Sequence, residues 1–245
     1  MNVSRSRDIA ACVDIPPGAD ADTEYGDGVN AFFTTRGFEA AGVDGIMLED
    51  HVSPQRRGHM KGKEVISAEQ GVEKIRAAVE ARHDPDFIIK ARTDSMATHG
   101  GKEAIRRLNL YAVAGADLLF AGVLLAKNDI ALAAREVSKP LSANRGFGIR
   151  ARPTTPLLCA KQLQDLGVAV ASCPRLVTSA AIMGMRNALT VLKQSVEEGR
   201  VIERPDLAVS FVEINDLMGL RTIREMQQRF LTPGQLEAKY GTKQA

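Results

Sequence analysis

The sequence has 245 residues, of which 44% are hydrophobic and 25% charged, and its formal net charge is +2. This length suits one large domain with a sizeable core. Aromatic residues make up only 4% and Trp is absent, so the basic surface and stacking rings that nucleic-acid binding uses are not indicated. The longest strongly apolar stretch, residues 118–126, is too short to span a bilayer, and residues 1–8 are too polar for a signal peptide.

The three cysteines, Cys12, Cys159 and Cys173, stand far apart and form no CxxC pair. Such spacing is typical of reduced thiols rather than of a disulfide framework. We therefore expect a cytoplasmic protein without a membrane partner.

Short apolar runs alternate with segments of helical period along the chain. A first segment ends at Asp20-Ala21-Asp22, and five later runs without polar alternation predict strands covered on both faces. These runs are residues 45–48, 87–91, 118–121, 140–143 and 168–172. Between them, Ser67 and Gln70 form a capping box ahead of a predicted helix, and Ile105, Leu108 and Ala112 mark another.

A weak repeat marks three joints between helix and strand, at Gly42, Gly115 and Gly167. A glycine just past a helix can adopt the left-handed conformation that ends it, and the next strand then follows at once. Helix and strand therefore alternate, which predicts an α/β fold with a parallel sheet or barrel.

We count six strand–helix units, whereas a closed TIM-type (β/α)8 barrel has eight. The first unit contains Pro16, Pro17 and Gly18 where a central strand should lie. We therefore expect a barrel that lacks its first two β/α units, and an open doubly wound sheet is the alternative. The predicted domains are an incomplete barrel over residues 1–205 and a C-terminal helical segment over residues 206–245.

That C-terminal segment carries an apolar stripe at helical spacing. The stripe packs on a partner subunit or on the chain's own barrel, and the spacing does not decide between the two. Its residues are Phe211, Ile214, Leu217 and Met218.

Polar side chains follow four of the predicted strands. In parallel barrels the active site lies at this end of the strands, so we expect these side chains to lie at one rim. They are Asp20 and Asp22 after the first strand, Glu49 and Asp50 after the second, Arg92 and Asp94 after the third, and Asn144 after the fifth.

Asp20, Asp22 and Glu49 offer only oxygen ligands, which favours Mg²⁺, or Mn²⁺, over zinc. Arg92 has the fork geometry that binds a carboxylate through two hydrogen bonds. Together these groups would stabilise the negative charge that develops beside a 2-oxo acid when a bond breaks. The alternative is that Arg92 forms a structural salt bridge with Asp94 or Glu49.

Several motifs resemble those of the isocitrate lyase and phosphoenolpyruvate mutase superfamily, including methylisocitrate lyase and 2,3-dimethylmalate lyase. The metal loop D-A-D-T-G-[YF]-G is similar to residues 20–26, and the lid motif E-D-Q…K-R-C-G-H is similar to residues 49–51 and 55–59. A-R-T-D matches residues 91–94, A-N matches 143–144, and T-P-L matches 155–157. The likeness runs from about residue 9 to residue 230.

This resemblance implies a Mg²⁺-dependent enzyme that cleaves a carbon–carbon bond in a small 2-hydroxy or 2-oxo carboxylic acid, such as methylisocitrate, dimethylmalate or oxaloacetate. It also implies a homo-oligomer, namely a tetramer with swapped C-terminal helices. The residue roles that it implies are metal ligands at Asp20, Asp22 and Glu49, catalytic Arg92, His59, Arg56 and Arg57, and substrate-binding Arg92, Gly58, Asn144 and Thr155.

The chain departs from the family pattern at Gln55 and Arg57, where the lyases have Lys and the acidic Cys. Glu24 replaces a glycine in the metal loop, and Ala121-Gly122 stands in place of Pro-Glu. Two alternatives therefore stay open: a truncated, catalytically impaired barrel that acts as a binding or assembly module, and a phosphonopyruvate or carboxyphosphonate phosphorylmutase.

Overall fold

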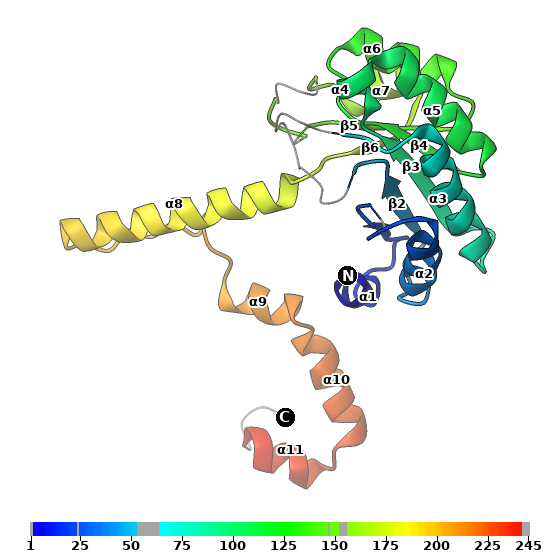
Figure 1. The fold of residues 1–245 in the computed structure, drawn as a ribbon. Helices are drawn as coiled ribbons and strands as arrows, with labels where there is room; N and C mark the ends of the chain where they lie inside the picture. Colours follow the sequence, from blue (N-terminus) through cyan, green and yellow to red (C-terminus); the bar gives the residue numbers. More distant parts are fainter. Residues whose placement is uncertain (1, 24, 53–63, 147, 152–155, 242–245) are drawn as a thin grey trace. The chain divides into compact units, whose positions relative to one another are not determined.

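The structure of the protein is a computed structural model that describes residues 2–23, 25–52, 64–146, 148–151 and 156–241. The chain divides into two compact units, Met1–Leu176 and Val177–Ala245 (Figure 1). The first unit contains the sheet, and the regular elements described in the second unit are helices.

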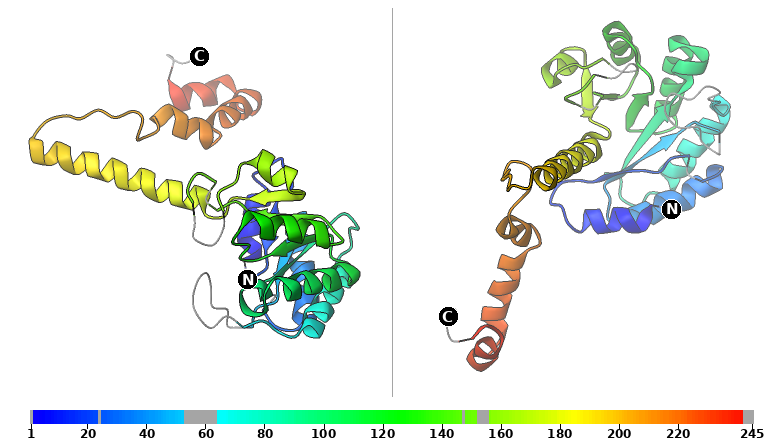
Figure 2. Two further views of the ribbon diagram at one scale, coloured as in Figure 1. Left: turned by 90° about the horizontal axis from the view of Figure 1, so that it is seen from above. Right: turned by 90° about the vertical axis from the view of Figure 1, so that its left-hand side faces the viewer.

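The first unit is built on a parallel sheet of six strands whose order in space is their order in the sequence. The strands are β1 (Gly18–Asp20), β2 (Gly45–Glu49), β3 (Ile88–Thr93), β4 (Leu118–Ala121), β5 (Leu141–Asn144) and β6 (Val168–Ser172). The strand order never reverses, unlike that of a doubly wound sheet, so the α/β fold is of the barrel kind. The sheet is curled, with helices on its outer side (Figure 2).

Helices cover the outer side because each returns the chain from one strand to the start of the next. Those of the first unit are α1 (Val3–Ala10), α2 (Gly28–Glu39), α3 (Ala68–Ala81), α4 (Ser95–His99), α5 (Gly101–Val113), α6 (Lys127–Glu136) and α7 (Ala160–Asp165). Of these, α2, α3, α5, α6 and α7 contact the strands directly.

The predicted strands agree with the observed ones to within one or two residues, and two runs have the predicted bounds. The predicted capping box is present, since the Ser67 hydroxyl accepts from Gln70 N–H and the Gln70 side chain accepts from Ser67 N–H. Gly42, Gly115 and Gly167 have φ of 83°, 109° and 87°, which confirms that the helices before them end in a left-handed residue. The segment with the two prolines forms only the three-residue edge strand β1.

The two faces of the sheet have different surroundings. On the outer face, alternate residues pack under the helices in one hydrophobic core that includes Ile46, Ile89 and Leu119. The residues between them face the inner side and are partly polar, as with Lys90 and Arg92 on β3. Because successive side chains of a strand point to opposite faces, one face packs against the helices and the other lines the inner cavity, where a ligand can bind.

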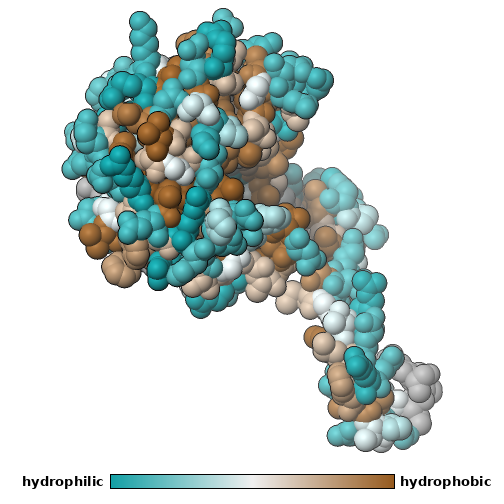
Figure 3. All heavy atoms as spheres, turned by 90° about the vertical axis from the view of Figure 1, so that its right-hand side faces the viewer, coloured by the Kyte–Doolittle hydropathy of each residue, from teal (hydrophilic) through white to brown (hydrophobic). Residues whose placement is uncertain are grey.

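The described residues of the second unit form four helices: α8 (Leu176–Glu198), α9 (Phe211–Leu217), α10 (Leu220–Phe230) and α11 (Pro233–Tyr240). None of its described side chains is buried, although it carries many large apolar residues. Phe211 is 77% exposed and Leu217 is 87% exposed. Hydrophobic side chains, drawn in brown, lie at the surface of this unit in Figure 3.

Among the described helices, we find none with both the length and the apolar character needed to cross a membrane.

Two adjacent isoleucines of β3 test the assignment of the two faces. Ile89 is completely buried in the outer core, whereas Ile88 is 40% exposed on the inner side. Ile89→Ala should therefore lower the free energy of unfolding by about 2–5 kcal/mol through the cavity it leaves. The matched control Ile88→Ala should cost less than about 1 kcal/mol. Denaturation in urea measures both, and equal losses would contradict the assignment.

Candidate functional site

The candidate site lies where β1, β2 and β3 end, at one edge of the sheet. Asp20 is the last residue of β1, Glu49 is the last residue of β2, and Arg92 is the last but one of β3. The register pairs Glu49 with Arg92 directly. Because all three strands are parallel, their C-terminal ends bring side chains that are up to 72 positions apart in the chain to one place.

Backbone hydrogen bonds hold the loop after β1 against β2. Glu49 N–H donates to the Asp22 carbonyl over 3.0 Å, and Asp22 N–H donates to Asp20 Oδ1, also over 3.0 Å. Asp22 has φ of 51°, a left-handed conformation that Asp tolerates better than most residues because its short side chain bonds locally. From α3, Lys74 Nζ donates to the Thr23 carbonyl over 2.8 Å. The loop is therefore fixed from two sides.

Three carboxylates meet at this point. One oxygen each from Asp20, Asp22 and Glu49 lies within 4.8 Å of the other two. An ion such as Mg²⁺, which takes ligands at about 2.1 Å and usually keeps several waters, can bridge such a set directly or through water. The donors are all hard oxygens, which is the chemistry that Mg²⁺ and Mn²⁺ prefer.

The Glu49 carboxylate is only 4% exposed. Burial raises its pKa to about 7, and Asp20 and Asp94 act in the same direction against the opposing charge of Arg92. Without a metal, Glu49 therefore keeps its proton to a higher pH than an exposed glutamate does. A cation bound by Asp20, Asp22 and Glu49 would offset the repulsion that Glu49 experiences from Asp20 and Asp94. The electrostatics of these residues therefore fit a bound metal.

Arg92 bridges two of the buried carboxylates. Its Nη1 donates to Glu49 Oε1 over 2.5 Å, and its Nε donates to Asp94 Oδ2 over 2.8 Å. Burial alone would lower the pKa of Arg92, but Asp94 and Glu49 outweigh it and raise that pKa. The salt bridges considered as the structural alternative for Arg92 are thus present. They use Nε and Nη1 and leave Nη2 without a hydrogen-bond partner among the described residues.

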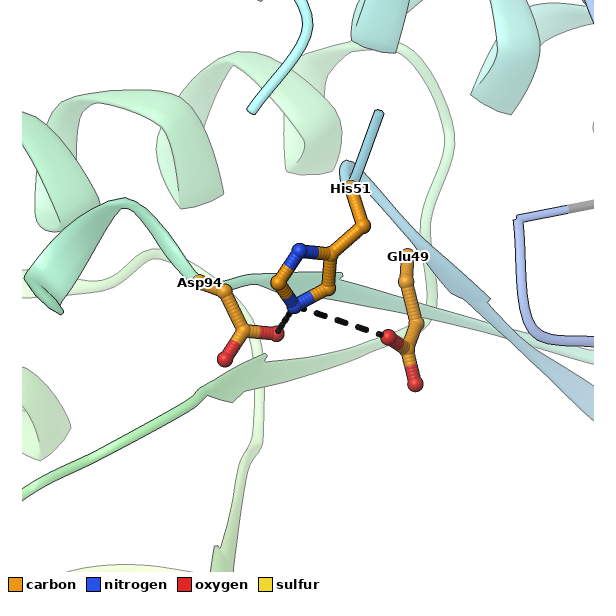
Figure 4. A group of neighbouring side chains, drawn as sticks. All are labelled: Glu49, His51 and Asp94. Carbon is orange, nitrogen blue, oxygen red and sulfur yellow. Dashed lines mark ion pairs between the residues drawn. The ribbon is translucent and has the colours of Figure 1, made fainter. Parts of the chain in front are cut away.

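His51 is a buried member of the site that the sequence did not single out. Its Nε2 lies 3.0 Å from Asp94 Oδ2 and 4.0 Å from Glu49 Oε2 (Figure 4). The sequence feature that could have indicated His51 is its position directly after Glu49-Asp50, where the family motif has Gln. Glu49, His51 and Asp94 also have atoms close enough to hold a metal, but Arg92 already binds both of these carboxylates. This second group is therefore better suited to holding Arg92 than to holding an ion.

Asp50 lies behind the site and is 2% exposed. Its Oδ2 accepts from Thr93 Oγ1 at 2.6 Å, Tyr111 OH at 3.1 Å and Arg107 Nη1 at 3.2 Å, and its Oδ1 accepts from Asp94 N–H at 3.0 Å. These donors come from β3, α5 and the turn after β3. Asp50 therefore positions Asp94, which in turn positions Arg92.

Gly122 allows the close approach of β4 to this network. A Cβ at Gly122 would lie 2.4 Å from Asp94 Oδ1, which no side chain could occupy without displacing that carboxylate. At the Ala121-Gly122 pair, which departs from the family pattern, the Asp94 carboxylate thus occupies the space that a side chain at position 122 would need.

Asn144, at the end of β5, lies on the same cavity of about 630 Å³ as Asp20 and Arg92. Its Oδ1 accepts from Ser172 Oγ at 2.7 Å. This bond orients the Asn144 amide, and the NH₂ group has no hydrogen-bond partner among the residues that the structure describes. The predicted site residues Arg56, Arg57, Gly58, His59 and Thr155 lie outside the described residues, as do Glu24 and Gln55.

Comparisons with known proteins agree on one family. The family model described as phosphoenolpyruvate phosphomutase matches residues 1–193. The 2,3-dimethylmalate lyase of Eubacterium barkeri is 39% identical over 94% of this chain and 77% of its own length. The 2-methylisocitrate lyase of Aeropyrum pernix is 36% identical over 86% of this chain and 66% of its own length. These named relatives are lyases.

Among solved structures, a phosphonopyruvate hydrolase in complex with oxalate and Mg²⁺ has a TM-score of 0.80 and 28% identity. The match covers 94% of this chain and 78% of that one. The chain thus spans about two thirds to four fifths of the length of the proteins named here.

The raised pKa of Glu49 predicts a pH dependence of stability in the absence of divalent metal. Between its ordinary value of 4.5 and about 7, the folded chain keeps a proton on Glu49 that the unfolded chain releases. Because the folded state binds more protons in this window, its free energy of unfolding should decrease as the pH rises from 4.5 to 7. Urea denaturation in EDTA at several pH values measures this slope.

Glu49→Gln should remove that part of the slope, because the amide does not titrate. The control Glu73→Gln, at an exposed glutamate of α3, should retain it. An unchanged slope in Glu49→Gln would show that another group causes the pH dependence.

Proposed function

The chain belongs to the phosphoenolpyruvate phosphomutase family, and we propose that it is a Mg²⁺-dependent lyase that cleaves a carbon–carbon bond in a small 2-hydroxy or 2-oxo carboxylic acid. The observation that carries the proposal is the meeting of the Asp20, Asp22 and Glu49 carboxylates beside Arg92 at the end of three strands. We further propose that the six strands correspond to six of the eight in a closed barrel of this family.

Asp20, Asp22 and Glu49 would hold the metal, Glu49 directly or through water. A bound Mg²⁺ supplies an electrophile that binds the substrate carboxylate and its neighbouring 2-oxygen. The loop after β1 needs little rearrangement for this, because its bonds to β2 and Lys74 already fix it. The three oxygens are therefore preorganised for a cation.

Arg92 would bind the substrate's carboxylate or developing enolate oxygen through Nη2. Its other two nitrogens are held by Glu49 and Asp94, so the guanidinium keeps one orientation while a substrate enters. The amide NH₂ of Asn144 would donate a second hydrogen bond from the far side of the cavity. Fixed donors of this kind stabilise charge in a transition state without reorganising. The catalytic roles of His59, Arg56 and Arg57 and the substrate contacts of Gly58 and Thr155 stay predictions.

The proposal is tested with purified protein, Mg²⁺ and four substrates: 2-methylisocitrate, 2,3-dimethylmalate, oxaloacetate and phosphonopyruvate. We expect Mg²⁺-dependent cleavage of at least one of the first three. Turnover of phosphonopyruvate alone would assign the mutase or hydrolase branch of the chemistry instead. A folded protein that binds Mg²⁺ but converts none of the four would favour the alternative of a binding module.

Asp22→Asn provides the matched test of the metal site. We expect Mg²⁺ affinity, measured by calorimetry, to fall by about a hundredfold or more, because losing a group that merely supports a metal ligand already costs about ten- to a hundredfold. Asp14→Asn, at an exposed aspartate before β1, is the control and should leave the affinity unchanged. Equal affinities in the two variants would contradict the assignment.

We also propose that the chain forms a homo-oligomer, with a tetramer as the state that the family resemblance implies. The support is the second unit, whose described residues bury no side chain although its helices carry many large apolar residues. Exposed large apolar side chains in such number are typical of an association face. A cytoplasmic location stays a prediction from the cysteine spacing.

Sedimentation velocity should therefore give a mass well above that of one chain. The double variant Phe211→Glu and Leu217→Glu should shift the protein toward smaller species, since it places two charges on the apolar stripe of α9. Gln228→Glu, at an exposed position of α10, is the control for added charge. A monomeric unaltered chain would overturn the proposal.

A further inference from the structure

Lys90 is a residue of the inner sheet face that the proposed chemistry does not use. It lies on β3 two positions before Arg92, so both side chains face the cavity of about 630 Å³ that they line together. Lys90 itself is only partly buried. The amine at the end of its side chain is therefore within reach of a small molecule that enters the cavity.

The side chains around Lys90 are largely apolar. Its partners in the register are Met47 on β2 and Leu118 on β4, which line the same cavity. The ring of Phe120 lies against it, with its centroid 4.9 Å from Nζ. None of these three side chains offers an oxygen or nitrogen that could accept a hydrogen bond from an ammonium group. The surroundings therefore favour the neutral amine, because they replace little of the water that the charged form loses.

Two charged side chains act on Lys90 in opposite directions. Arg92 repels its charge from the same strand, and the guanidinium carbon lies 5.2 Å from the centroid of Phe120. Asp20 attracts its charge from β1, but Met47 lies between the two in the sheet, and among the described residues no carboxylate forms an ion pair with Lys90. Burial and the charge of Arg92 together outweigh Asp20 and lower the pKa of Lys90 to about 8. About a tenth of the Lys90 amines are therefore uncharged at neutral pH.

Apolar surroundings and a second cation are the two features that make a lysine nucleophilic in proteins. The matching electrophile is a carbonyl group. A 2-oxo acid has a carboxylate directly beside its carbonyl, and Arg92 lies on the same inner face with Nη2 unpartnered among the described residues. Arg92 can therefore hold the carboxylate of a 2-oxo acid while the carbonyl carbon meets Lys90 Nζ.

We infer that Lys90 is a covalent capture site for small carbonyl compounds, and for 2-oxo acids in particular, which it binds as an imine. The neutral Nζ attacks the carbonyl carbon and forms the carbon–nitrogen bond. The carbon–oxygen bond then breaks, and the oxygen leaves as water with the two hydrogens of the amine. No oxidant or reductant is consumed, and hydrolysis reverses the reaction. This activity is separate from the carbon–carbon cleavage proposed above, because it depends on the amine of Lys90 and not on the metal site.

The inference is tested by incubating the full chain with pyruvate and cyanoborohydride, which reduces an imine to a stable secondary amine. Peptide mapping by mass spectrometry then gives the rate of modification at each lysine. At neutral pH, Lys90 should be modified about tenfold or more faster than Lys102, because more of its amine is uncharged. Lys102 is an exposed lysine of α5 and serves as the control within the same chain.

The ratio of these two rates removes the pH dependence of the reagent itself. Since Lys90 is already largely uncharged above about pH 8 and an ordinary lysine is not until about pH 10, the ratio should fall as the pH rises from 7 to 10. A constant ratio would show that Lys90 is merely accessible and would overturn the inference.

Hydroxyacetone tests the part that Arg92 has in the inference, because it is a carbonyl compound of the same size as pyruvate without the carboxylate. The preference for Lys90 over Lys102 should be smaller with hydroxyacetone than with pyruvate. Equal preferences would contradict the selectivity for 2-oxo acids.

Lys90→Arg keeps a cation in the cavity but removes the nucleophilic amine. The rapid first modification should disappear from the mass of the whole chain, whereas the matched variant Lys102→Arg should retain it. Thermal unfolding of each variant shows that it is folded before the rates are compared.

The outcomes separate this inference from the proposed function. If Lys90 in the folded, unaltered chain reacts no faster than Lys102 at neutral pH, the capture site is wrong, whatever the lyase assays give. If Lys90 reacts rapidly and no substrate is cleaved, the capture site stands and the proposed function fails.

Discussion

Two buried carboxylates, those of Asp50 and Asp94, hold the end of the sheet in one geometry. A buried charge costs several kcal/mol unless donors replace the water that it loses, so each carboxylate needs a full set of partners. Asp50 receives donors from Thr93, Arg107 and Tyr111 and from the backbone of Asp94, which ties β2, β3 and α5 together. Asp94 in turn holds Arg92, because its side chain accepts a hydrogen bond from Arg92 Nε and also lies 3.0 Å from His51 Nε2. The orientation of Arg92 is therefore set by groups that no substrate needs to touch.

The same network explains why the site accumulates negative charge. Glu49, Asp94 and Asp50 lie close together, and among the described residues Arg92 and Arg107 form ion pairs with them. Burial raises the pKa of Glu49 to about 7. Asp20 and Asp22 add to this charge from the loop after β1. A divalent cation bound by Asp20, Asp22 and Glu49 would offset this negative charge.

Local patterns in the sequence were sufficient to predict the strands of the first unit and two of its helices. Apolar runs without alternation located β2 to β6, because strands that pack under helices carry few charged residues. The capping box at Ser67 and the glycine at Gly115 marked helix ends through hydrogen bonds and backbone angles that depend only on nearby residues. Asp20, Asp22, Glu49 and Arg92 were predicted to meet because parallel strands end at one edge, and the structure brings them together.

The surroundings of His51 and Lys90 could not be predicted from local patterns in the sequence. His51 follows Glu49 and Asp50 in the chain, yet its burial against Asp94 depends on how closely β2 and β3 approach, which no local pattern encodes. The environment of Lys90 depends on Phe120 from β4, whose ring centroid lies 4.9 Å from Lys90 Nζ, and on the charges of Arg92 and Asp20. The sequence by itself determined the alternation of strands and helices and the acidic residues at the strand ends, since both follow from short-range periodicity and parallel order. Only the tertiary structure decided which charges are paired, because pairing is set by distances between strands that are far apart in the chain.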